Sequence, residues 1–273
     1  MRIGAYALRR RGGTRQPRLT KLLPLLASLS TVSHAVEQRP LPIEFAVTES
    51  IVMTDQDELY LSPAVQFFRL PDQKRLTAGS EIAYGFTDRL QLTTQIPYIF
   101  VDPDGGGATS GIGDVSVAGR YAVLDYREHP YGLDIGLGLQ LPTGDRRRDL
   151  GDGRVALAPS LTASAWLGPV NAQANGAWHH AFAAAAEPRD EGEYNLAFVY
   201  PIRRWFVVLE GNGESNHERT NYYVTPEVVW KTTEALELRL AIPVPVTRTA
   251  GDYAVIAGFT IEFEHLLHPT EEG

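Results

Sequence analysis

The sequence predicts an all-β protein, a single antiparallel transmembrane β-barrel of about twelve strands. Three observations lead to this fold class. Apolar residues alternate with small or polar ones in segment after segment, the connections between segments alternate in length, and aromatic residues gather at segment ends. Because successive side chains of a strand point to opposite faces, such a chain presents one apolar face to lipid and one polar face to a lumen.

The first 35 residues are typical of a secretory signal peptide. They contain six Arg, one Lys and no acidic residue, followed by the apolar run LLPLLASLSTV and the small-residue sequence Ser33-His34-Ala35. This order predicts cleavage after Ala35. A transmembrane helix needs about 20 apolar residues, so the short apolar run argues against that alternative. We expect residues 1–35 to be removed on export.

Charge and cysteine content narrow the possible functions. Without residues 1–35 the chain has 18 Lys and Arg against 33 Asp and Glu, a formal charge of −15. This balance argues against nucleic acid as a partner, because nucleic-acid binding uses a concentrated basic face. The absence of Cys excludes disulfides, zinc-thiolate sites and cysteine nucleophiles. No cofactor is predicted.

Residues 36–57 come before the regular alternation begins. The stretch IEFAVTESIVMT within them has three interpretations. It is a further strand, an arm in the periplasm, or a segment folded into the barrel as a plug.

The barrel itself is predicted over residues 58–263. Residues 89–101 show the pattern clearly, because Leu90, Leu92 and Ile96 lie on one face and Arg89 and Gln91 on the other. No helical spacing fits this arrangement. The twelve predicted strands are 58–70, 75–86, 89–101, 113–124, 131–142, 155–167, 170–180, 193–202, 205–214, 221–230, 236–244 and 252–263.

The connections between these strands alternate between short and long. Short ones are predicted at 87–88, 126–130, 167–169, 203–204 and 231–235, and long ones at 102–111, 143–153, 181–192, 215–220 and 245–252. The first connection, 71–74, is an exception: the alternation places it among the long loops, but it is short. Outer-membrane barrels have short periplasmic turns and longer extracellular loops, and an even strand number returns both chain ends to the periplasm.

Aromatic residues on the outward phase provide an independent check, because aromatic rings favour the two membrane interfaces. Trp166 is the exception: it falls on the inward phase unless a bulge changes the register. A soluble β-sandwich would also have alternating strands, but it would not explain the aromatic ends. The outward aromatic residues are Tyr84, Phe86, Tyr98, Phe100, Tyr121, Trp178, Tyr194, Tyr200, Trp205, Tyr222, Trp230, Tyr253 and Phe263.

Charged residues within the strands fall on the inward phase. Asp114 and Arg120 share this phase in one strand, and an Arg facing lipid at the bilayer midplane would cost about 2–4 kcal/mol. Two interpretations remain open: the charges line a water-filled pathway and select solutes, or they form paired networks that fill a narrow lumen. The predicted lumen-lining residues are Glu81, Asp114, Arg120, Asp134, Gln140, Glu210, Glu227, Glu237, Arg239 and Glu262.

The loop TGDRRRDLGDG holds a second set of candidate residues, Asp145, Arg146, Arg147 and Arg148. Its aspartates suggest a calcium site, but the intervening arginines oppose cation binding and no EF-hand spacing is present. The prediction is therefore a solvated loop that folds partly inward, without a metal ion.

An enzyme is the less favoured interpretation, and no catalytic residue is predicted. Some outer-membrane barrels hydrolyse lipids with a Ser/His/Asn arrangement, for which this chain offers Ser215, Asn216 and His217. These three residues lie together in a predicted loop, where the side chains of adjacent residues usually diverge. Nucleophilic catalysis instead needs the base within hydrogen-bond reach of the hydroxyl. His179 and His180 point to opposite faces of a strand, which makes them poor joint metal ligands.

The run GIGDVSVAGRY from Gly111, followed by LQLPTGD and LGDG, resembles a specific family. It is similar to the outer-membrane barrel transporters named for the meta-pathway of phenol degradation, closely so over residues 111–159. The resemblance implies an outer-membrane location and uptake of small organic compounds, with aromatic compounds as candidates. The chain departs from the usual barrel ending, because the tail 264–273 follows Phe263.

These observations predict an outer-membrane channel or transporter of a Gram-negative bacterium. Its expected role is passive or facilitated uptake of small organic solutes, and its expected partners are outer-membrane lipid and those solutes. An outer-membrane lipid hydrolase and a non-conducting structural barrel are the alternatives.

Overall fold

A computed structural model describes residues 40–70, 72–182, 190–216, 220–247 and 253–264. The predicted signal peptide and nearly all of the predicted tail lie outside these residues. Within the described ranges, no helix is long and apolar enough to cross a membrane.

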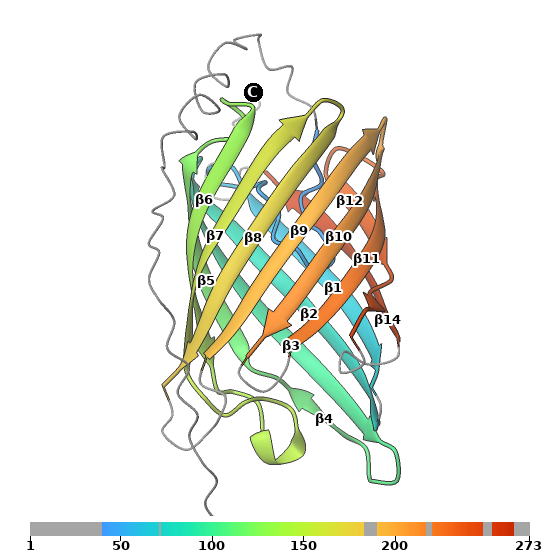
Figure 1. Cartoon of the computed structure of the whole chain (residues 1–273). Coiled ribbons are helices and arrows are strands. Elements are labelled where there is room, and N and C mark those ends of the chain that lie inside the picture. Colours follow the sequence, from blue (N-terminus) through green and yellow to red (C-terminus); the bar gives the residue numbers. More distant parts are fainter. Residues whose placement is uncertain (1–39, 71, 183–189, 217–219, 248–252, 265–273) are drawn as a thin grey trace, which may run out of the picture. The chain divides into compact units, whose positions relative to one another are not determined.

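The described chain forms a closed antiparallel barrel, which confirms the predicted fold class (Figure 1). The first and last strands pair with each other, from Leu59 opposite Phe263 to Arg69 opposite Tyr253. Twelve strands make the wall: β1 Leu59–Arg69, β2 Gln73–Thr87, β3 Leu90–Pro103, β5 Val115–Leu124, β6 Tyr131–Leu141, β7 Ala156–Leu167, β8 Val170–Ala181, β9 Asp190–Ile202, β10 Trp205–Ser215, β11 Thr220–Lys231, β12 Leu236–Ala241 and β14 Tyr253–Phe263. The short strands β4 (Thr109–Ile112) and β13 (Val244–Pro245) pair with β3 and β11.

The predicted alternation of connections is also observed. Tight turns such as Arg203-Arg204, between β9 and β10, lie at one rim. Arg203 has φ 58° and Gly168 φ 64°, so each supplies the left-handed residue that its two-residue turn requires. The other rim carries β4 and the 3-10 helix η2 (Arg146–Arg148), at the lower end of Figure 1. By the rule for bacterial barrels, the rim with tight turns faces the periplasm.

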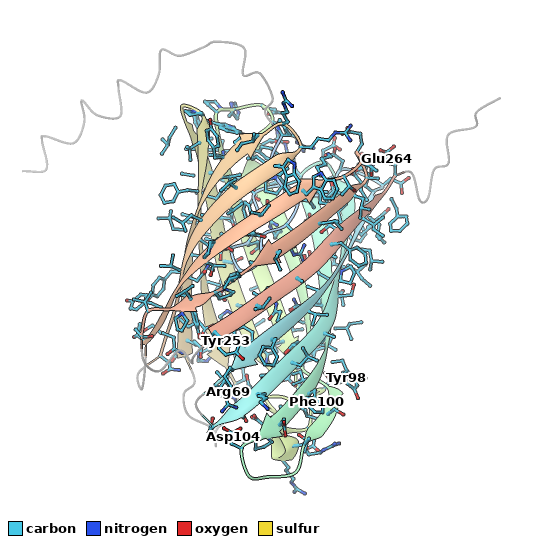
Figure 2. The ribbon with its side chains drawn as sticks, turned by 90° about the vertical axis from the view of Figure 1, so that its right-hand side faces the viewer. Arg69, Tyr98, Phe100, Asp104, Tyr253 and Glu264 are labelled. Carbon is cyan, nitrogen blue, oxygen red and sulfur yellow. The ribbon has the colours of Figure 1, made fainter. Side chains whose placement is uncertain are left out.

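The outward face of the barrel is apolar and ends in aromatic side chains (Figure 2). Tyr98 and Trp178 are each 51% exposed, and Trp205 stacks on Trp230 with ring centroids 5.0 Å apart. Side chains of this kind on a barrel exterior suit the two membrane interfaces. Trp166 differs from these outward aromatic residues, as its inward phase in the sequence predicted. It points inward without a bulge and packs against buried residues inside the barrel.

Residues 40–57, which we call the inner segment, run inside the barrel near the rim with tight turns (Figure 1). They belong to no strand, although Asp57, at the end of the segment next to β1, donates its backbone N–H to the carbonyl oxygen of Gly85 on β2 at 2.9 Å. Their partners are the inward side chains of the wall, which makes this segment the centre of the candidate site.

Candidate functional site

Three carboxylates on neighbouring strands hold the first half of the inner segment. Glu237 on β12 accepts the backbone N–H of Ile43 at 2.9 Å, and Glu227 on β11 accepts that of Ala46 at 3.2 Å. Glu210 on β10 accepts the backbone N–H of Thr48 at 2.5 Å. Since residues 43–48 have no ladder partners, these carboxylates satisfy backbone donors that would otherwise be buried unpaired. The structure thus brings three predicted lumen-lining residues together on one segment.

The second half of the inner segment is held from the opposite wall. Gln173 on β8 accepts the backbone N–H of Ile51 at 2.8 Å, and Gln91 on β3 accepts that of Thr54 at 2.8 Å. Both glutamines are buried, at 0% and 4% exposure. The segment is therefore bound to both sides of the wall.

Arg120 on β5 is the central cation of the site. Its guanidinium donates to the carbonyl oxygen of Ser50 at 2.6 Å and to Asp134 at 2.7 Å, and its Nε lies 3.0 Å from Glu49. The side chains of Arg120 and Asp134 are only 7% and 3% exposed. A buried ion pair of this kind is strongly destabilising when one partner is removed. Arg120 therefore ties β5 and β6 to the tip of the inner segment.

Apolar packing completes the attachment of the inner segment. Leu41, Phe45 and Ile51 are 7%, 4% and 1% exposed and form one cluster with inward residues of the wall. Those wall residues are Ala197, Val199, Phe206, Val208 and Val229, and Trp166 packs against the cluster. Close-packed side chains therefore fill the lumen here, where a water-filled pathway would need polar walls.

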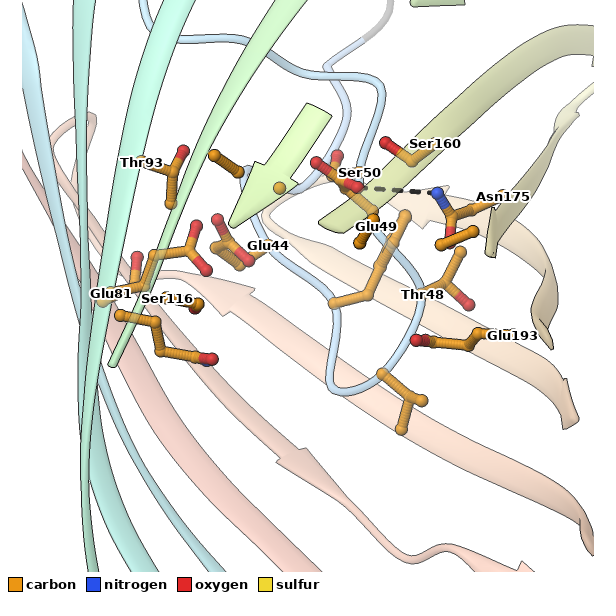
Figure 3. A pocket seen from close by; sticks show the side chains of 18 of the residues that line it. Glu44, Thr48, Glu49, Ser50, Glu81, Thr93, Ser116, Ser160, Asn175 and Glu193 are labelled. Carbon is orange, nitrogen blue, oxygen red and sulfur yellow. Dashed lines mark hydrogen bonds between the residues drawn. The ribbon is translucent and has the colours of Figure 1, made fainter. Parts of the chain in front are cut away.

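A cavity of about 510 Å³ lies against residues 44–50 of the inner segment, which form part of its wall (Figure 3). Most of its wall residues are small or polar. Glu81 lines it beside Glu44, and the carboxyl groups of the two residues are in contact. Burial raises the pKa of Glu44, while the nearby guanidinium groups of Arg239 and Arg120 lower it. The polar lining residues include Ser62, Thr77, Thr93, Gln95, Ser116, Gln140, Ser160 and Asn175.

Asp114, together with Gln140, lies at a different part of the lumen from the residues that hold the inner segment. Its carboxylate accepts the backbone N–H of Gly144 at 2.9 Å and of Asp152 at 2.6 Å, together with the side-chain amide of Gln140 at 3.1 Å. Leu150, from the same loop, is 1% exposed and packs with Ile99 and Val101 of β3. Asp114 therefore anchors the loop 142–155 over the mouth opposite the inner segment.

We expect Asp114→Ala to release this loop. Hydrogen bonds to a charged acceptor contribute about 1.5–3 kcal/mol, so their loss raises the loop's open population by roughly tenfold or more. Arg146, Arg147 and Arg148 are exposed, so trypsin added to intact cells reports the change as faster cleavage there. Asp102→Ala, a change on β3, is the control and leaves the cleavage rate near that of the wild type. An unchanged rate in Asp114→Ala would contradict the anchoring role.

The remaining predicted residues have partners outside the inner segment. Arg239 lines the cavity and donates to the hydroxyl of Thr260 at 3.1 Å. Glu262 lies at the rim with tight turns, where burial and the charges of Glu262 and Glu264 raise the pKa of Glu58 to about 7. Asp145, Arg146, Arg147 and Arg148 are exposed in and beside η2. Asp145 caps η2 by accepting the backbone N–H of Arg147.

The residues considered for hydrolysis do not form a catalytic arrangement among the described residues. Ser215 Oγ lies 2.9 Å from Thr220 Oγ1, which is no general base. His179 lines the cavity near Glu193, while His180 pairs with Asp190 and packs on Trp178. His217 lies outside the described residues.

Solved structures share this fold at low sequence identity. An outer-membrane channel from Pseudomonas putida F1 matches with a TM-score of 0.60 and 16% identity over 76% of this chain and 96% of its own. The KdgM porin matches with a TM-score of 0.54 and 9% identity over 74% of this chain and 99% of its own. The NanC porin matches with a TM-score of 0.52 and 9% identity over 76% of this chain and 99% of its own. The chain thus has the fold of outer-membrane channels.

Comparison with curated protein sequences found no significant match. The family described as "Putative MetA-pathway of phenol degradation" matches residues 75–263. This range runs from β2 through β14 and includes the motif residues from Gly111 onward. The chain belongs to this family of outer-membrane barrels, as its motifs predicted.

Proposed function

We propose that this protein is an outer-membrane channel for the passive or facilitated uptake of small organic solutes, closed on its periplasmic side by the inner segment. The observation that carries the proposal is a polar cavity in the lumen that ends on a segment bound there mainly through side chains of the wall. Residues 1–35 serve as the signal peptide, and residues 40–57 act as a plug.

The inner segment can leave the lumen without disturbing the wall. Each of the twelve wall strands pairs with two neighbours, and none of these strand pairings includes residues 40–57. Opening therefore requires that the side-chain hydrogen bonds and the packing of Leu41, Phe45 and Ile51 be given up. The backbone hydrogen bond from Asp57 to Gly85 can meanwhile hold the end of the segment at the rim. Local rearrangements of this size occur on functional timescales while the rest of a fold stays intact.

The cavity suits a small organic solute. A cavity of about 150 Å³ is large enough to bind benzene, so about 510 Å³ holds a single-ring compound together with water. Hydroxyl and amide groups in its wall, such as those of Ser116 and Asn175, replace part of a solute's hydration during passage. The family description supports aromatic compounds as candidates.

Single-channel recording tests this proposal. Purified wild-type protein in a planar bilayer is expected to give discrete conductance steps separated by long closed intervals, because the inner segment is bound at rest. The unheated protein should migrate differently from the heated protein on a gel, which verifies the intact barrel. Failure of the intact barrel to conduct would contradict the channel. Lipid hydrolysis that Ser215→Ala abolishes would favour a hydrolase instead.

A further inference from the structure

Glu210, Glu227 and Glu237 form a row of carboxylates across three adjacent strands. Their side chains all reach the inner segment, and the residues are 1%, 2% and 3% exposed. Each uses Oε2 to accept one backbone N–H, from Thr48, Ala46 and Ile43 respectively. We call these three residues the carboxylate row.

The inner segment satisfies only half of the carboxylate row. In each residue Oε1 is buried and receives no N–H donor from the described residues, while the carboxyl groups of Glu210 and Glu227 lie in contact with each other. An ionised carboxylate has two acceptor oxygens, and burying one of them unsatisfied is costly. A backbone offers one donor at each contact, whereas an ammonium offers three donors and a guanidinium five, with a full charge. The row is thus better matched to a cationic donor than to the segment that occupies it.

Fixed cations do not balance the three carboxylates of the row. Arg120 is paired with Asp134 and Glu49. Arg239 donates to the neutral hydroxyl of Thr260 and its charge acts on Glu227 and Glu237, but it offsets one carboxylate charge of the three. Once the inner segment withdraws, the carboxylate row faces the lumen water, where a Glu carboxylate is ionised at neutral pH. This sector of the open lumen is then negatively charged.

We propose that the open channel favours cationic solutes, specifically small organic amines and guanidines, whose N–H donors replace the inner segment on the carboxylate row. The proposal deepens the proposed function and rests on it. An arriving cation competes with the backbone N–H groups of Ile43, Ala46 and Thr48, so binding of the solute also favours the open state. Anions of the same size are repelled by the negative charges of the carboxylate row and have no N–H donors to offer it.

Bilayer recording with matched probes tests the solute class. Benzylammonium, benzyl alcohol and benzoate share a ring and a similar size but differ in charge. In a KCl gradient the wild type is expected to give a reversal potential that corresponds to a K⁺/Cl⁻ permeability ratio of about 10 or more. Benzylammonium should raise the open probability and reduce the K⁺ current, whereas benzoate should do neither.

The variant Glu210→Gln/Glu227→Gln/Glu237→Gln removes three charges while keeping side-chain size. Its permeability ratio should fall towards one, and its response to benzylammonium should disappear. Glu234→Gln is the matched control, because its side chain is 88% exposed in the turn before β12 and lies outside the lumen. If the triple variant fails to assemble, the three single variants serve, each with a smaller shift.

The outcomes separate this inference from the proposed function. An intact barrel that never conducts refutes the channel itself. A conducting wild type that is unselective or prefers Cl⁻, or a triple variant with unchanged selectivity, refutes the cationic solute class while the channel stands. Opening by benzyl alcohol as strongly as by benzylammonium would show that ring size, and not charge, decides entry.

Discussion

Replacing Arg120 by alanine is expected to lower the free energy of unfolding by about 3–5 kcal/mol and to raise the fraction of time that the channel is open. The side chain joins β5, β6 and the inner segment through Asp134, Glu49 and the carbonyl oxygen of Ser50. Its loss leaves Asp134, which is 2% exposed, buried without its counter-charge. Urea unfolding in phospholipid vesicles measures the stability, and bilayer recording measures the open probability.

Two further variants show whether burial of the charge causes this effect. Arg120→Ala/Asp134→Asn removes the uncompensated charge and should recover much of the lost stability, while the channel stays open because Ser50 and Glu49 have lost their partner. Arg89→Ala breaks the pair between Arg89 and Glu128, whose side chains are 42% and 57% exposed. Exposed pairs contribute about 0–1 kcal/mol, so this control should behave like the wild type. Equal effects in Arg89→Ala and Arg120→Ala would contradict the assigned role.

The wall of the barrel was predictable because membrane strands repeat one physical rule. Lipid on one side and a lumen on the other impose a period of two, so strands such as β3 and β6 are marked by their own residues. Observed bounds differ from the predicted ones by a few residues. At β12 the strand ends at Ala241, and β13 continues it after Ile242 and Pro243. Proline cannot donate to the ladder, which explains the interruption.

The role of the inner segment could not be predicted, because its contacts link backbone groups to side chains far away in sequence. Ile43 meets Glu237, and Ile51 meets Gln173, without any repeating pattern that would mark such pairs. The alternation in IEFAVTES resembles a strand equally well. Gln91 and Gln173 were absent from the predicted lumen residues, since an amide on the inward phase carries no special signal.

One signal of a filled lumen was nevertheless present in the sequence. Inward positions near the tight turns of β9 to β11 carry Val199, Phe206, Val208 and Val229, where a water-filled lumen would favour polar residues. Trp166 on the inward phase belongs to the same pattern, because all five residues pack with or beside the inner segment. Apolar inward residues that gather at one end of a barrel therefore predict a segment folded inside it.

A reversible cross-link tests most directly the central claim that the inner segment closes the channel. Thr48 on the segment and Asn212 on β10 have side-chain atoms 3.5 Å apart, and the chain has no Cys of its own. In the variant Thr48→Cys/Asn212→Cys, a disulfide fixes the segment to the wall. Thr48 belongs to no strand, and the change at Asn212 leaves the backbone pairing of β10 in place, so the barrel should assemble normally.

The measurement is a single-channel recording of this oxidised variant before and after a reducing agent is added to the same membrane. Complete cross-linking is verified by thiol titration, and the single variants Thr48→Cys and Asn212→Cys control for the substitutions. The account predicts a silent membrane before reduction and conductance steps like those of the single variants after it. Conductance that is the same before and after reduction, from fully cross-linked protein, would contradict closure by the inner segment.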